Sequence, residues 1–406
     1  MQLDFNNLIE KFKYDPNSVK KDYDGKTDIY LAKASYRYAY FRRILCVLLI
    51  LVIIAFLLSG SLSYDKLFYL TKDIKLANDY VNSVHDTITY NVGNSQSFIT
   101  YREGLAVASR ERLSVFSAGG REIFSSNHSY GNPALASSEK YVLLYDVGGK
   151  QFALYNSFSQ VKNETLDYTI YGASIARNGT FALITRADRY DSVVSVYKTN
   201  GTRYDYSFSE GRVISVSLSE KGTEMAVLLT LTNGDGFYTE LRLYRIGKED
   251  YSSANTDFDG IPYAVKILDG GNIMVVGANG VNTFNSNLNL LNEYFTDEEI
   301  YRYYFGEDSI AISHLSKESG KTEVVILNKR GKIDKKYLFD DRILDVALCD
   351  GYLFVQTLGG FERRNMTLNT SEKIDIVATD YKMIVSDKNT LIICDDSYAK
   401  YLNIGE

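Results

Sequence analysis

The chain has 406 residues with 45 Lys and Arg against 51 Asp and Glu, and this net charge of -6 argues against a nucleic-acid-binding protein. Three cysteines are too few for a disulfide framework. With only three prolines, the breaks between secondary-structure elements must rely on Gly, Asn and Asp.

The strongest local signal is an unbroken apolar run, Ile44–Leu58, which Ser59–Leu62 continue. At about 1.5 Å per residue, a helix over 44–62 is about 28 Å long and can cross a bilayer core. Basic residues gather before the run and the charges after it are mixed, so the positive-inside rule places residues 1–43 in the cytoplasm and the rest outside. A buried core helix or a cleaved signal peptide competes with this signal anchor, but the first is seldom apolar on every face and the second has a shorter leader.

The segments on either side of this transmembrane helix carry weaker signals. Residues 1–43 are predicted to be a cytoplasmic tail that sets the topology, with recruitment of a cytoplasmic partner as the alternative. Residues 63–84 are predicted to form a stalk or linker, whose apolar residues have helical spacing. The extracytoplasmic domain then occupies residues 85–406.

From about Thr87 the hydrophobic period becomes that of β-strands, and a repeat appears. Each unit has a strand, a tight polar turn and a more apolar strand, and the turn centres are about 31 to 49 residues apart. This spacing is typical of the four-stranded blades of a β-propeller. The turns lie at residues 102–104, 138–140, 177–179, 220–222, 269–271, 306–308, 349–351 and 380–382. The sequence therefore predicts an all-β propeller with eight blades, or seven blades and an irregular hairpin.

A third strand and a more polar fourth strand follow in most units, and we assign the polar runs 121–126, 335–340 and 399–404 to the outermost position. Inner strands are apolar on both faces because they pack between neighbouring blades. The remaining strand-like run, His85–Asn91, is expected to close the ring by pairing with the last blade. A sandwich of two sheets would need longer repeats and a Cys/Trp core, and the chain has no Trp.

No group of residues has a catalytic, cofactor-binding or metal-binding signature. The three histidines, His85, His128 and His314, are far apart, and no cysteine lies beside any of them. The acidic segments 233–236 and 257–260 offer oxygen ligands for calcium but lack the spacing of a calcium loop, so we interpret both as turns. No G-x-S-x-G motif and no Gly-rich phosphate loop occur. We therefore predict a protein that is not an enzyme and holds no metal or cofactor.

Tyrosines are abundant, and their densest group is Tyr301–Phe305, which we predict to be an inner strand. Aromatic side chains at the mouth of a propeller can anchor a partner, although blade packing explains most strand tyrosines. Cys46 falls in the predicted membrane helix. Cys349 and Cys394 end apolar strand-like runs and are interpreted as buried free thiols, with a disulfide between them as the alternative.

Two stretches, Ser174–Thr185 and Ser215–Thr230, resemble the second-strand turn of WD40-like and TolB-type propellers, in which a small residue, a polar turn with Gly and an apolar strand follow one another. The Gly-His and Trp-Asp signatures of WD40 repeats are missing. The whole layout is similar to that of a clostridial family of single-pass membrane proteins of unknown function. This resemblance implies a propeller at the cell membrane and no catalytic residues.

The leading functional hypothesis is a membrane-anchored, extracytoplasmic interaction or scaffolding module that binds a protein partner of the cell envelope. The alternative is a ligand-binding or hydrolytic propeller acting on cell-wall glycan or a small molecule. Carboxylates converging on the central channel would favour the alternative, whereas a channel of Ser, Ala and Val would count against it. A third hypothesis makes the propeller a sensor that signals through the cytoplasmic tail.

Overall fold

In the computed structural model, the described residues are 38, 40–52, 87–90, 96–138, 140–156, 159–234, 236–256, 260–376 and 381–404. The chain divides into two compact units, Met1–Ile74 and Lys75–Glu406. In the first unit, residues 40–52 are helical. Within the described ranges no helix is both long and apolar enough to cross a bilayer. The second half of the predicted membrane helix, most of the predicted tail and the whole predicted stalk lie outside those ranges.

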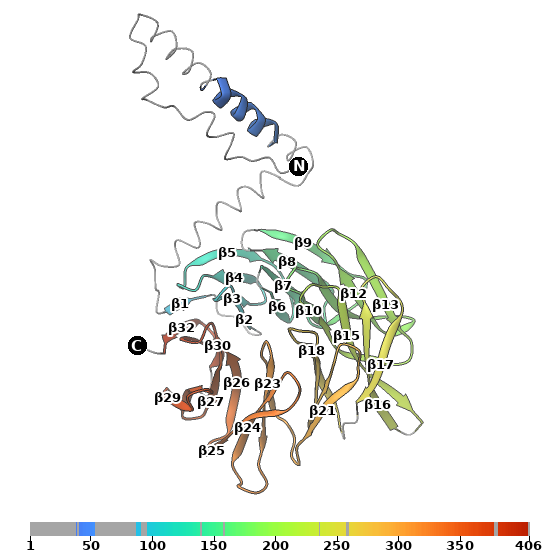
Figure 1. Ribbon diagram of the computed structural model, residues 1–406, viewed down its shortest axis with the longest axis vertical. Coiled ribbons are helices and arrows are strands. Elements are labelled where there is room, and N and C mark those ends of the chain that lie inside the picture. The colour runs from blue at the N-terminus through green and yellow to red at the C-terminus, as the bar shows by residue number, and fades with distance from the viewer. Residues whose placement is uncertain are drawn as a thin grey trace, which may run out of the picture. The chain divides into compact units, whose positions relative to one another are not determined.

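The second unit is a β-propeller of eight four-stranded antiparallel blades (Figure 1), which confirms the predicted fold and blade number. Blade 1 has β2 (Ser97–Tyr101), β3 (Gly104–Ala108), β4 (Arg112–Phe116) and β5 (Glu122–Asn127), and blade 2 has β6 (Pro133–Ser137), β7 (Tyr141–Asp146), β8 (Gln151–Asn156) and β9 (Gln160–Thr165). Blade 3 has β10 (Ile170–Ile175), β11 (Phe181–Ala187), β12 (Tyr190–Tyr197) and β13 (Arg203–Phe208), and blade 4 has β14 (Arg212–Leu218), β15 (Glu224–Asn233), β16 (Gly236–Arg245) and β17 (Tyr251–Thr256). Blade 5 has β18 (Pro262–Ile267), β19 (Ile273–Gly277), β20 (Gly280–Phe284) and β21 (Leu290–Phe295), and blade 6 has β22 (Arg302–Phe305), β23 (Ser309–Leu315), β24 (Thr322–Asn328) and β25 (Ile333–Phe339). Blade 7 has β26 (Ile343–Cys349), β27 (Tyr352–Thr357), β28 (Gly360–Asn365) and β29 (Thr370–Ile374), and blade 8 has β30 (Lys382–Val385), β31 (Thr390–Cys394), β32 (Tyr398–Asn403) and β1 (Thr87–Thr89).

Blade 8 closes the ring with strands from both ends of the propeller. The first strand, β1, pairs antiparallel with β32, and Ile88 lies opposite Ala399. The prediction that the run 85–91 closes the ring is confirmed for its described strand. Because β1 supplies the outermost strand, the last stretch of chain contributes only three strands.

This sharing of strands makes the predicted eighth repeat wrong. Residues 382–385 are the innermost strand of blade 8, not the strand after the first turn, and the turn itself lies at 386–389. Residues 399–403 belong to the third strand, not to the outermost one. The outermost position was assigned from the polarity of this run. The third strand of this blade is also polar because it carries a charged side chain, Lys400.

The hydrophobic cores lie between blades, one for each of the eight interfaces. On β3, Leu105 and Val107 pack against blade 8, whereas Ala106 and Ala108 pack against blade 2. This alternation follows from the two-residue period of a strand. It confirms that the inner strands are apolar on both faces.

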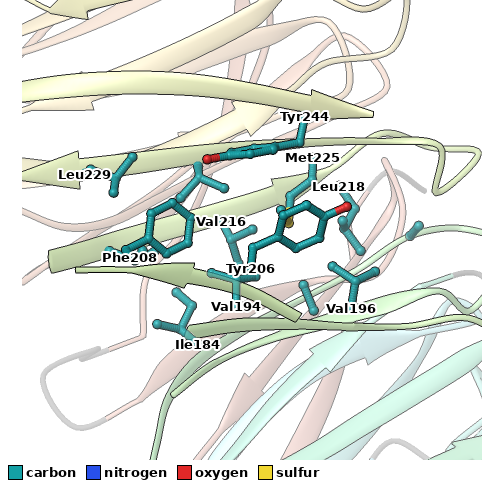
Figure 2. Packing of buried hydrophobic residues seen from close by; sticks show 14 of the residues in the cluster. Ile184, Val194, Val196, Tyr206, Phe208, Val216, Leu218, Met225, Leu229 and Tyr244 are labelled. Atoms are coloured by element: carbon teal, nitrogen blue, oxygen red, sulfur yellow. The ribbon is translucent and has the colours of Figure 1, made fainter. Parts of the chain in front are cut away.

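The largest of these cores joins blades 3 and 4 (Figure 2). The ring of Tyr244 lies 5.0 Å from that of Tyr206 and 6.3 Å from that of Phe208, measured between centroids. Val216 and Met225 fill the space beside these rings. Each blade thus buries both faces only because it has a neighbour on each side.

The turns between the first and second strands also hold neighbouring blades together. In the predicted turn 177–179, Gly179 has φ +86°, which favours glycine. The side-chain Oδ1 of Asn178 accepts a hydrogen bond from the backbone N–H of Thr180 at 2.9 Å. Its Nδ2 donates to the carbonyl of Lys221, in the corresponding turn of blade 4, at 2.7 Å.

The channel has two ends, which we name by the connections found there. At the turn end lie the turns between the first and second strands, which line a common cavity. At the loop end lie the hairpins between the second and third strands and the connections between blades, because strand direction alternates in each antiparallel blade.

Candidate interaction surface

The eight innermost strands line the channel, and all of them lie within the described residues. Together they carry a single carboxylate. That carboxylate belongs to Asp345, and burial raises its pKa. Four cationic side chains lie on these strands: Arg212, Lys266, Arg302 and Lys382. The other positions are mostly apolar residues, Ser or Thr. The innermost strands therefore offer no pair of carboxylates of the kind that cleaves glycosidic bonds.

At the turn end, a cavity of about 760 Å³ is predominantly acidic. Its acidic lining residues are Glu220, Asp269, Glu307, Asp308, Asp334 and Asp350. Arg177 pairs with Glu220, and Lys329 lies 3.4 Å from Asp308. No group of three or more His, Cys, Asp or Glu side chains within the described ranges is arranged to hold a metal ion.

At the loop end, three cavities follow one another from blade 2 to blade 6. Their volumes are about 760, 810 and 520 Å³. The first two share Arg186, Asp191 and Ser209, and the last two share Pro262. Because neighbouring cavities share lining residues, they form one continuous hollowed surface.

Large apolar side chains are exposed along this surface. Strands β15 and β16, the longest of the described strands, pair along their whole length and end in a hairpin at the loop end. Phe237 on this hairpin is 57% exposed, and Ile261, which follows blade 4, is 61% exposed. We name the loop-end patch as the exposed residues Tyr168, Tyr190, Phe237, Tyr238 and Ile261.

The third cavity of the loop end is a tyrosine pocket between blades 5 and 6. The rings of Tyr263 and Tyr303 are stacked with centroids 6.2 Å apart. The hydroxyl of Tyr263 donates to the Oε1 of Glu299 at 2.6 Å, and burial raises the pKa of Tyr263 to about 12. The hydroxyl of Tyr301 is buried and has no hydrogen-bond partner among the described residues. The lining residues are Pro262, Tyr263, Glu299, Ile300, Tyr301 and Tyr303.

The predicted aromatic run therefore contributes lining residues to cavities at both ends of the channel. Its strand is confirmed as β22, the innermost strand of blade 6, which begins at Arg302. Tyr301 and Tyr303 line the tyrosine pocket, whereas Tyr304 and Phe305 line the cavity at the turn end. Tyr263 and the loop-end patch were not identified from the sequence because their residues come from different blades.

The other residues considered from the sequence do not gather into a site. The ring of His128 packs against that of Tyr130 at a tilt of 47°, with centroids 4.5 Å apart, and His314 lies 3.3 Å from Glu323 in blade 6. His85 and residues 235 and 257–259 of the acidic segments lie outside the described ranges.

Cys349 and Cys394 are both free thiols, as predicted, but only Cys394 is buried, whereas Cys349 is half-buried. Burial and the neighbouring Asp350 raise the pKa of Cys349 to about 11. At pH 8 we expect iodoacetamide to alkylate Cys349 at least about 100-fold more slowly than an unfolded cysteine of pKa about 8.5, because only the thiolate reacts. The rate should rise about tenfold per pH unit up to that pKa, as followed by peptide mass spectrometry; a flat profile between pH 7 and 10 would contradict it.

Several solved β-propellers have a similar fold. Sqt1 from Saccharomyces cerevisiae matches with TM-score 0.56 and 10% identity, over 80% of this chain and 100% of that one. Sqt1 from Chaetomium thermophilum, solved bound to the N-terminus of the ribosomal protein L10, matches with TM-score 0.55 and 10% identity, over 78% and 99%. BamB from Moraxella catarrhalis matches with TM-score 0.51 and 12% identity, over 79% and 99%. At these identities the likeness shows the fold alone.

Sequence comparison gives a family but no curated relative. No curated protein matches the chain. The family model described as "Family of unknown function (DUF5711)" matches residues 78–404. This range contains every strand of the propeller.

Proposed function

We propose that this chain, which belongs to the DUF5711 family of unknown function, is a protein-interaction platform whose partner docks on the loop-end patch. The observation that carries the proposal is the gathering of five exposed apolar side chains over one continuous surface. Aromatic side chains in such a place bind partners well because they bury much area at little cost in conformational entropy. The fold by itself does not select this function.

The solved propeller that holds a peptide gives further support. Sqt1 from Chaetomium thermophilum is described as bound to the N-terminus of a protein. A propeller of similar fold thus accepts a polypeptide segment, which is the kind of ligand proposed for this chain.

We also propose that the propeller is anchored by a single membrane helix over residues 44–62 and lies outside the cytoplasm, where its partner belongs to the cell envelope. The support is the apolar run with basic residues before it, a layout similar to that of the clostridial single-pass family. Residues 44–52 lie in the described helix, and their large apolar side chains are exposed. Such side chains suit a lipid environment.

A second candidate function is ligand binding in the acidic cavity at the turn end. Its volume of about 760 Å³ and its six acidic lining residues favour a cationic small molecule. We favour the interaction platform because Glu220 and Asp308 are already paired with Arg177 and Lys329, and because Lys266 also lines the cavity.

Photo-crosslinking tests the loop-end patch directly in cells. A photoreactive amino acid at position 237 of the full chain is expected to give a discrete adduct with a partner protein. The matched control is position 368, because Leu368 is 71% exposed but lies in a turn between the third and fourth strands of blade 7, at the turn end.

A substitution makes this test specific to the patch. Ile261→Asp should remove the adduct at position 237 by placing a charge in the apolar surface, while the chain remains folded because Ile261 is exposed. Equal crosslinking at 237 and 368, or an adduct that survives Ile261→Asp, would refute docking on this patch.

A further inference from the structure

We propose that the tyrosine pocket receives a cationic side chain, Lys or Arg, of the docked protein partner. This inference rests on the proposed function and names the chemistry of one contact. It starts from the composition of the pocket, in which three of the six lining residues are tyrosines. An aromatic ring attracts a cation that lies within about 6 Å of its centroid.

The charge of the pocket selects a cation over a neutral group. Among the described residues that line it, Glu299 is the only charged one. Its Oε1 accepts a hydrogen bond from the neutral hydroxyl of Tyr263, at 2.6 Å. Lys317 contacts the neighbouring Glu298, so Glu299 is the carboxylate that this loop presents to the pocket.

The cations close to the pocket are held by other groups. Lys317 contacts Glu298 at 3.5 Å and donates to the carbonyl of Asp297 at 3.2 Å. Arg302 donates to the carbonyls of Tyr301 and Leu344. Neither Lys317 nor Arg302 is among the residues that line the pocket. The carboxylate of Glu299 is therefore available to a cation from outside.

One of the three rings already attracts a cation. The guanidinium carbon of Arg342 lies 5.9 Å from the ring centroid of Tyr301. Arg342 does not line the pocket, so it does not occupy it. This distance lies within the range of a cation–π attraction.

The pocket is joined to the proposed docking surface. Pro262 lines both the pocket and the neighbouring cavity that contains Phe237 and Ile261. A polypeptide lying on the loop-end patch can thus place a long side chain into the pocket. This continuity favours a side chain of the partner over a free small cation.

The test measures binding of matched peptides to the purified full chain by saturation-transfer NMR. A short acetylated peptide with a central Lys is compared with the same peptide carrying norleucine, which keeps the alkyl chain and lacks the charge. We expect the Lys peptide to bind about tenfold more tightly, as a partly desolvated cation–π contact implies. Choline and its neutral isostere 3,3-dimethylbutan-1-ol test a free cation.

Variants locate the effect in the pocket. Glu299→Gln and Tyr303→Leu should each weaken binding of the Lys peptide at least about threefold, whereas Tyr303→Phe, which keeps the ring, should retain it. Leu368→Ala, at the turn end and away from both the patch and the pocket, is the control. Equal binding of both peptides, no effect of Glu299→Gln, or binding of choline but not of the Lys peptide would overturn the inference. If the adduct at position 237 still forms in such a case, the interaction platform stands without this contact.

Discussion

Replacing Ile88 with Asp is expected to lower the free energy of unfolding of the propeller by about 4 kcal/mol, because it places an unpaired charge inside a hydrophobic core. Ile88 is 6% exposed and packs among residues of blades 8 and 1: Leu105, Val107, Phe116, Ile392, Cys394, Ala399 and Tyr401. This core joins the last blade to the first. The loss should appear as a lower midpoint of urea unfolding followed by far-UV circular dichroism.

The neighbouring residue provides the control. Thr89 lies on the same short strand, pairs with Tyr398 and has an exposed side chain. Thr89→Asp should change the free energy of unfolding by no more than about 0.5 kcal/mol. If Ile88→Asp and Thr89→Asp change the free energy of unfolding by the same amount, β1 does not hold the ring closed.

The prediction of blade number succeeded because its signal is local. Each of the first seven turns puts polar residues between an inner strand and a strongly apolar second strand, and six of them include a glycine. Positive φ angles at Gly179 and Gly222 show why glycine stands there. The prediction of the eighth unit was wrong because the fourth strand of this blade comes from the other end of the propeller. No local sequence pattern indicates that pairing.

The candidate site was harder to predict for a different physical reason. A tyrosine on a strand has the same sequence signal whether it is buried between blades, like Tyr206, or exposed, like Tyr238. Exposure depends on which strand or loop covers it, and that is decided by residues of neighbouring blades. The tyrosine pocket unites Tyr263 of blade 5 with Tyr301 and Tyr303 of the next repeat. The sequence therefore predicted the aromatic run that contains Tyr301 and Tyr303. It carried no signal that Tyr263 would lie beside them.

The second large effect is expected at Arg363, on the third strand of blade 7. Its side chain is only 6% exposed and its Nη1 donates to the carbonyls of Lys388 and Ile404, at 2.8 and 2.5 Å. Its Nη2 donates to the Oε2 of Glu372 at 2.7 Å. One guanidinium thus joins the outer strand of its own blade to a turn of blade 8 and to the carbonyl just after β32.

Arg363→Met is expected to cost about 2 to 3 kcal/mol of unfolding free energy, since it leaves the buried carbonyl of Ile404 without its donor. The carboxylate of Glu372 is 55% exposed and stays hydrated, so the loss of its ion pair adds little. Arg363→Lys keeps the charge but cannot donate in several directions from a planar group, so it should recover only part of the loss. The control is Arg203→Met, because Arg203 and Asp205 form an ion pair at 2.8 Å with both side chains exposed. Urea unfolding of the three variants measures the difference.

A loss for Arg363→Met no larger than for Arg203→Met would mean that the seam between blades 7 and 8 depends on its apolar core alone, which Leu391 and Phe354 supply. A large loss here, together with the loss expected for Ile88→Asp, would show that the last blade needs both the strand from the other end of the propeller and this buried arginine to stay in the ring.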